Sequence, residues 1–279
     1  MPPAINRARF MTLAMLGLAL TSRLPAQELQ AQDRKSIFFD IGPEIEYYEY
    51  REPGIMKEYG GLFGGYASFT AFTMDQSLFL QAFGSIAGGT LTYDGGTYDG
   101  EPLTLDTPNI LYNFRALVGP NFGGEKASFL PFSGFCIRLI DDDLKRNYEW
   151  GYRRQTTYFY SPIGFELSTR SMLWSFGVKG EFDIFWLGLN NNRDFPTSDR
   201  SREDVNLTQD PFTGFGLQGS FFACAQVNRY LYITIEPFVR YWDVKKSSEK
   251  NILTDAGNLT VYEPDNNTLV YGVRCGMGW

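Results

Sequence analysis

The stretch Val270-Tyr-Gly-Val-Arg-Cys-Gly-Met-Gly-Trp279 decides the fold of this chain. Successive side chains of a strand point to opposite faces, so residues at alternate positions share a face. One face of this stretch is apolar and closes on an aromatic residue, through Tyr271, Val273, Cys275, Met277 and Trp279. The other face carries small residues around one cation, Arg274. This pattern is typical of a transmembrane barrel strand, with lipid on the apolar side and a crowded lumen on the other.

The same stretch resembles the C-terminal assembly signal of Gram-negative outer-membrane β-barrel proteins, which has apolar residues at alternate positions before a final Phe or Trp. Tyr271, Met277 and Trp279 would carry the signal here. The resemblance implies an outer-membrane location with both termini periplasmic. It also implies membrane lipid as a partner, and the barrel assembly machinery during biogenesis.

The N-terminal residues predict export. Arg7 and Arg9 precede an apolar run, residues 10–20, that is too short to cross a bilayer as a helix. We interpret residues 1–26 as a signal peptide cleaved after Ala26, with cleavage as late as Ala31 left open. Residues 27–279 are then expected to form one barrel domain.

Composition supports an all-β chain. Aromatic residues make up 16% of it and glycines number 29, while no second long apolar run follows the first. Apolar residues are therefore spread in alternation, as in strands. The net charge of −7, or −10 once three arginines of the signal segment are lost, argues against a nucleic-acid partner.

Alternating segments predict a transmembrane, antiparallel, up-and-down β-barrel of about ten strands, with eight or twelve left open. A soluble lipocalin-like barrel is the rival fold, but aromatic residues such as Trp174, Trp186 and Tyr241 end the apolar stripes, where interfacial girdles belong. Polar stretches 190–211 and 245–267 are expected to be loops. The predicted strands lie near Ile41–Tyr50, Gly61–Thr73, Leu78–Gly88, Asn109–Gly119, Ser128–Ile140, Thr156–Leu167, Trp174–Trp186, Thr213–Ala225, Tyr230–Val244 and Thr268–Trp279.

The face opposite the apolar stripes collects charged residues of both signs. Charges inside a narrow barrel need partners, so we expect salt bridges among them that pin the strand register. A selective pathway for small polar solutes is the alternative interpretation. The predicted lumen residues are Glu44, Glu46, Arg115, Arg138, Glu166, Lys179, Glu181, Asp183, Glu236, Arg240 and Arg274.

One polar loop is a candidate lipid-binding segment. Four cations alternate there with aromatic residues beyond the inferred interface, and guanidinium and ammonium groups suit phosphates. Contact with lipopolysaccharide is the resulting hypothesis, and an ordinary charged loop is the alternative. The residues proposed for this contact are Lys145, Arg146, Trp150, Arg153 and Arg154. The neighbouring triplet Asp141-Asp-Asp143 lacks the glycine and spaced ligands of a calcium loop, so we expect no metal site.

The chain contains no histidine. In size and inferred strand number it resembles the omptin proteases, but these need a catalytic histidine, and no position here can supply one. Imidazole is the usual general base near neutral pH. The sequence therefore predicts a non-enzymatic barrel without a cofactor, whose long loops serve surface, lipid or host contact. A narrow porin-like channel for small polar solutes is the alternative function.

Overall fold

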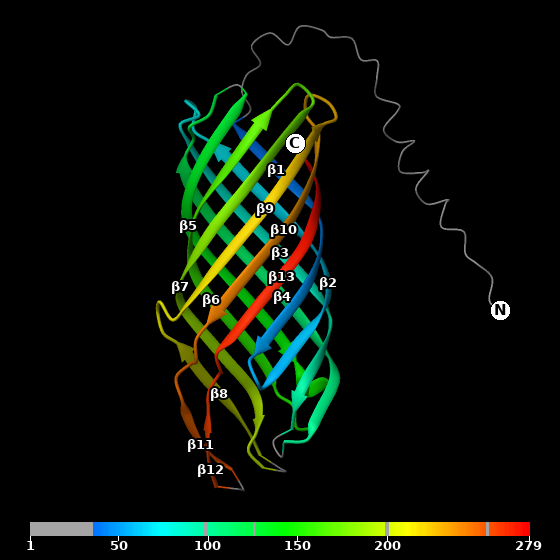
Figure 1. Ribbon diagram of the computed structural model, residues 1–279, viewed down its shortest axis with the longest axis vertical. Helices are drawn as coiled ribbons and strands as arrows, with labels where there is room; N and C mark the ends of the chain where they lie inside the picture. The colour runs from blue at the N-terminus through cyan, green and yellow to red at the C-terminus, as the bar shows by residue number, and fades with distance from the viewer. Residues whose placement is uncertain (1–35, 98–99, 125, 199–200, 255–256) are drawn as a thin grey trace, which may run out of the picture. The chain divides into compact units, whose positions relative to one another are not determined.

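Ten long antiparallel strands close into a barrel, as the sequence predicts (Figure 1). The computed structural model describes residues 36–97, 100–124, 126–198, 201–254 and 257–279. The predicted signal peptide, residues 1–26, and both predicted cleavage positions lie outside these ranges. Within them, no helix is long and apolar enough to cross a membrane.

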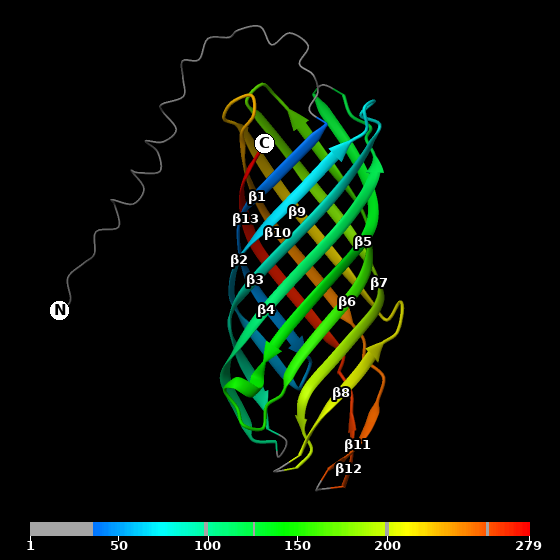
Figure 2. The same ribbon diagram turned by 180° about the vertical axis from the view of Figure 1, so that it is seen from behind.

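Each barrel strand pairs with its neighbours in the sequence, and β1 pairs with β13 to close the ring. The views from opposite sides show the strands inclined around one interior (Figure 2). In order around the barrel, the strands are β1 (Ile37–Glu52), β2 (Met56–Phe72), β3 (Leu78–Gly96), β4 (Pro102–Pro120), β5 (Ala127–Asp143), β6 (Arg153–Arg170), β7 (Trp174–Pro196), β9 (Gly214–Gln226), β10 (Tyr232–Val244) and β13 (Asn266–Gly278).

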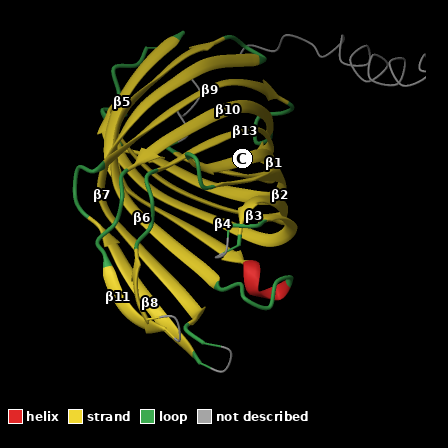
Figure 3. Cartoon of the chain, turned by 60° about the horizontal axis from the view of Figure 1, so that its bottom comes forward, coloured by secondary structure: helices red, strands yellow, loops and turns green. Residues whose placement is uncertain are grey.

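The two ends of the barrel differ. Short turns follow β2, β4, β6 and β9 at the end where the C-terminus lies (Figure 1). The opposite end, which we call the loop end, carries the short strands β8 (Arg202–Gln209), β11 (Lys250–Thr254) and β12 (Gly257–Val261). It also carries the one-turn helix η2 (Leu144–Arg146), red in the view towards this end (Figure 3).

The structure corrects the predicted strand ends. Several strands continue past their predicted limits at the loop end: β3 runs to Gly96 rather than Gly88, and β7 to Pro196 rather than Trp186. Of the two expected loops, residues 190–211 contain the end of β7 and all of β8, and residues 245–267 contain β11 and β12. Beyond the apolar stripes a strand does not contact lipid and needs no apolar face. The alternation of apolar and polar residues that predicts strands is therefore lost there, although the strands remain paired through their backbones.

A continuous apolar band covers the outer wall. Large apolar side chains are exposed on every barrel strand, among them Ile45, Phe63, Phe114, Val178 and Val239. Aromatic residues lie at both edges of this band. Tyr47 stacks on Tyr271 towards the loop end with ring centroids 5.1 Å apart, and Phe39 contacts Trp279 at the other end, at 4.9 Å. On β1 the band is followed by Glu49 and Arg51, which form an ion pair and mark its limit.

Candidate functional site

All eleven predicted lumen residues point into the barrel. Each alternates along its strand with apolar residues that are exposed on the outer wall. Glu44, Glu46, Arg138, Glu181, Asp183, Arg240 and Arg274 are buried. The side chains of Arg115, Glu166, Lys179 and Glu236 retain 11–28% exposure. The interior is therefore as rich in charge as the alternating pattern suggested.

Seven of these residues form one connected network. Arg274 is paired with Glu44, its neighbour on β1, and lies 3.9 Å from Glu236 on β10. Arg240 extends the network to Glu44 at 3.8 Å and Glu46 at 3.5 Å. Lys179 extends it the other way, to Glu236 at 3.3 Å and Glu166 at 3.7 Å. The network ties β1, β13, β10, β7 and β6 together through the interior.

The other four predicted residues behave differently. Arg115 on β4 forms an ion pair with Glu181 on β7. Among the described residues, the carboxylate of Asp183 and the guanidinium of Arg138 have no hydrogen-bond partner. Arg138 instead lies over the ring of Trp242, 4.1 Å from its centroid, on a strand nearly opposite in the ring order. A guanidinium over an aromatic face is stabilised by the negative charge of the π system.

Side chains fill the interior where Arg138 meets Trp242. Arg138 is 0% exposed and Trp242 5%, and Tyr48 and Leu62 in the same packed cluster are also buried. Charged groups therefore pack against aromatic rings at this level of the barrel.

A second buried cluster lies at the loop end, beyond the apolar band, and we call it the mouth cluster. At its centre, the guanidinium of Arg154 on β6 contacts four carboxylates. The N···O distances are 2.9 Å to Glu52, 3.3 Å to Asp142, 3.3 Å to Glu263 and 3.4 Å to Glu58. All five residues are buried, with 2–7% exposure. One cation thus holds together β1, β2, β5, β6 and the segment between β12 and β13.

Neutral donors complete the mouth cluster. The Tyr50 hydroxyl lies 3.0 Å from a Glu52 oxygen and 2.8 Å from a Glu263 oxygen. Thr107 and Asn109 on β4 donate to Asp142, at 2.6 Å and 3.3 Å. Two acceptors of the cluster nevertheless have no donor among the residues that the structure describes: the Oε1 atom of Glu58 and the Oδ1 atom of Asn109.

Burial changes the protonation of this cluster. It raises the pKa of Glu52 to about 7, with the Glu263 carboxylate as the next cause. Burial and the nearby Asp142 raise the pKa of Glu58 well above its usual range. Removing a carboxylate from water and placing it beside another carboxylate both favour its protonated form.

The sequence analysis missed Glu52, Glu58 and Glu263. A usable signal existed for Glu52, because the inward series Glu44, Glu46, Tyr48 and Tyr50 reaches Glu52 at the same spacing of two. The predicted strand Ile41–Tyr50 ends one step short of Glu52, because the Pro53-Gly54 pair that follows is typical of a loop. Gly54 instead makes this turn tight, since its φ of 78° lies in the left-handed region that favours glycine.

The predicted lipid-binding loop is divided by the structure, which corrects the grouping of its residues. Lys145, Arg146 and Trp150 are exposed, and Lys145 pairs with Asp194 at 2.9 Å. Arg153 pairs with Asp141 on the outer face. Arg154 follows Arg153 directly on β6, so its side chain points to the opposite face, into the interior. It is therefore not available to an external phosphate. The same alternation divides the acidic triplet: Asp141 faces outward while Asp142 is buried in the mouth cluster.

The loop end has a small hydrophobic core of its own. Phe195 and Val205 from the β7–β8 hairpin pack with Ile252 and Val261 from the β11–β12 hairpin. Arg202 on β8 also donates to the carbonyl oxygen of Gly151 at 3.0 Å, which attaches the segment between β5 and β6. The connections at this end therefore form one packed structure above the barrel.

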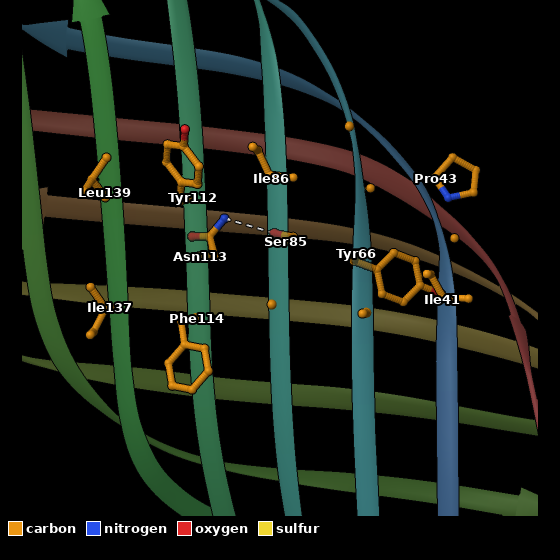
Figure 4. Close-up of a pocket in the computed structure, with 15 residues that line it drawn as sticks. Ile41, Pro43, Tyr66, Ser85, Ile86, Tyr112, Asn113, Phe114, Ile137 and Leu139 are labelled. Atoms are coloured by element: carbon orange, nitrogen blue, oxygen red, sulfur yellow. Dashed lines mark hydrogen bonds between the residues drawn. The ribbon is translucent and has the colours of Figure 1, made fainter.

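The outer wall has a groove of about 960 Å³ across β1 to β5 (Figure 4). It lies where outward positions carry small residues such as Gly65 and Gly84, and Ile86, Tyr112 and Phe114 border it. The groove is within the apolar band and its lining is mostly apolar. It is suited to acyl chains and brings no reactive groups together.

No protein-family model matches this sequence, and none of the curated proteins matches it significantly. Solved structures do match. The outer membrane protease OmpT of Escherichia coli aligns with a TM-score of 0.60 at 9% identity, over 91% of this chain and 99% of its own. The toluene transporter TodX of Pseudomonas putida aligns with a TM-score of 0.34 at 9% identity, over 88% of this chain and 89% of its own. Ail, the attachment invasion locus protein of Yersinia pestis, aligns with a TM-score of 0.32 at 9% identity, over 88% and 100%.

The chain has the fold of a small outer-membrane β-barrel protein. The likeness to OmpT concerns this fold alone. Tyr271, Met277 and Trp279 are exposed on the outer wall, the charged network lies in the interior, and the mouth cluster lies at the loop end.

Proposed function

We propose that this chain is an outer-membrane β-barrel of a Gram-negative bacterium that conducts no solute and works through its loop end. Both termini would be periplasmic, and the loop end would face outward. The observation that carries this proposal is the packed interior, in which Arg138 and Trp242 meet from nearly opposite walls without exposed surface. A barrel of about ten strands is narrow enough for its own side chains to fill it.

The outer wall supports the membrane location. A tilted strand needs about 9–11 residues to cross a bilayer, and the outward apolar run of β13, from Tyr271 to Trp279, matches that length. Aromatic residues at both edges of the band suit the two interfaces. Export by a signal peptide and insertion by the assembly machinery complete the proposal.

We also propose that the barrel is non-enzymatic. The mouth cluster is the main concentration of perturbed carboxyl groups outside the apolar band in the described residues, yet it is buried. Its carboxylates are paired with Arg154 rather than presented to a substrate. With no histidine in the chain, catalysis of the histidine-dependent kind has no residue to use.

Lipopolysaccharide remains the proposed contact of the exposed loop residues. Without Arg154, the set consists of Lys145, Arg146, Trp150 and Arg153. Their side chains join basic groups to an aromatic ring at the loop end, which suits phosphates near a headgroup layer. Changing Lys145 and Arg146 to Gln should weaken lipopolysaccharide binding by the folded barrel; unaltered binding would remove this contact.

Single-channel recording tests the closed interior. The refolded chain from residue 27 onward, shown to be folded by heat-modifiable gel migration, should give a silent planar bilayer. The double variant Arg138→Ala with Trp242→Ala removes two large side chains from the packed level and should give stable conductance steps. Stable steps from the unaltered protein would replace this proposal with the porin-like channel.

A further inference from the structure

The mouth cluster has more negative charge than its cation can balance. Arg154 faces Glu52 and Tyr50 from β1, Glu58 from β2 and Asp142 from β5. Glu263 reaches it from the segment between β12 and β13. Four tyrosines are within electrostatic range of the cluster, and Arg138 acts in turn on two of them, Tyr48 and Tyr158; the other two are Tyr93 and Tyr152. Of these, only Arg138 adds positive charge, and its side chain lies against Trp242.

Two buried acceptors of the cluster indicate independently that a hydrogen-bond donor is missing. Asn109 is 3% exposed, and its amide nitrogen contacts Asp142 while its Oδ1 atom has no donor among the described residues. The Oε1 atom of Glu58, which is 2% exposed, is in the same position. Two buried acceptors beside an excess of carboxylates are satisfied if carboxyl groups carry protons. The described residues contain no cluster of ligands suited to a metal ion.

The cluster also borders an open hollow, and one of its members lies outside the barrel strands. Glu52 lines an open hollow of about 650 Å³, bordered by Arg51, Lys57 and Asn267 at the rim. Glu263 belongs to no strand; its backbone pairs with Ser247, and its side chain reaches Tyr50 and Arg154. These side-chain contacts join the β11–β12 hairpin to the barrel interior.

We propose that the mouth cluster is a proton-binding site that latches the segment between β12 and β13 onto the barrel mouth. With protons on Glu52 and Glu58, two carboxylates remain around Arg154 and the cluster holds Glu263 against it. As protons are lost with rising pH, up to four carboxylates repel one another around one guanidinium. Glu263 is the member carried by a connecting segment rather than a barrel strand, so this segment is released first.

Hydrogen–deuterium exchange of the refolded full barrel tests the latch. In the unaltered protein, backbone protection of residues 257–265, corrected for the intrinsic effect of pH, should be about tenfold higher at pH 5.5 than at pH 8.5, since one pKa unit corresponds to tenfold. Glu58→Gln replaces the carboxyl with a neutral amide of the same shape and should make the loss of protection at pH 8.5 smaller, because one carboxylate fewer forms around Arg154. Glu49→Gln, on the outer face of the same hairpin, should leave the pH dependence unchanged.

Equal protection of the unaltered protein at both pH values would overturn the proposal. So would a folded Glu58→Gln barrel whose protection falls at pH 8.5 as much as that of the unaltered protein. If Glu58→Gln does not fold by gel migration, Glu52→Gln carries the same test with the same two outcomes. Conductance does not enter this test, so its result is independent of whether the barrel is a channel.

Discussion

Arg154 on β6 and Glu52 on β1 form an ion pair across the full width of the barrel mouth, with 2.9 Å between Nη1 and Oε1. The ring order places β6 five strands from β1 in either direction, so these two strands lie opposite each other. The pair therefore bridges the mouth rather than joining neighbours. Its buried position makes it sensitive to the loss of either partner, because an unpaired charge would remain inside.

Arg154→Met should destabilise the barrel by about 3–5 kcal/mol at pH 8, because four buried carboxylates lose their cation. Denaturant unfolding in detergent micelles measures the change. Lys145→Met is the matched control, since Lys145 and its partner Asp194 are both exposed and such pairs contribute about 0–1 kcal/mol. Equal effects of the two variants would contradict the central role of Arg154.

The free energy of unfolding should depend on pH through Glu52. Its pKa is raised from 4.5 to about 7 on folding. The folded state therefore holds the proton more tightly, and this contribution is complete below pH 4.5 and is lost as the pH rises towards about 7. Glu52→Gln should flatten the unfolding profile between pH 4.5 and about 7. A variant profile as steep as that of the unaltered protein would exclude Glu52 as the source.

Gly216 on β9 is a packing constraint on the interior. A Cβ atom added there would lie 2.6 Å from both the Oδ2 atom of Asp183 and the Nε1 atom of Trp242. Gly216→Ala should therefore cost about 1–3 kcal/mol, the usual range for overpacking. Gly219→Ala on the same strand is the control, because its Cβ would meet its nearest atoms at 3.8–4.0 Å. Comparable losses in the two variants would show that the cost comes from replacing a strand glycine as such and not from the contacts at Gly216.

Arg115 and Glu181 should be strongly coupled. Removing either partner alone, as Arg115→Met or Glu181→Met, leaves a buried charge and should cost about 3–5 kcal/mol. The double variant should be closer in stability to the unaltered protein than either single variant, because no charge is left unpaired. A double-mutant cycle in denaturant measures this coupling. Additive single effects would mean that the two groups act independently.

Strand faces were predictable from sequence at every lumen position, whereas the ends of strands were not. Glu44 and Glu46 face inward because Ile41 and Ile45 beside them face outward, and this alternation is a property of the local backbone. The end of β7 and all of β8 escaped prediction above the apolar band, because their exposed positions there carry polar residues such as Arg193 and Asn206. Arg154 was misplaced for the same reason: its strand was assumed to begin after it.

The sequence by itself determined that this chain is an antiparallel barrel of about ten strands and which side chains enter its interior. Those properties follow from period-two alternation, which each strand expresses without reference to the others. Only the tertiary structure decided which interior charges meet. Glu52 and Arg154 are 102 positions apart in the chain, and closure of the ring brings them together across the mouth. Contact across a closed barrel depends on strand order, tilt and register together, so no local pattern records it.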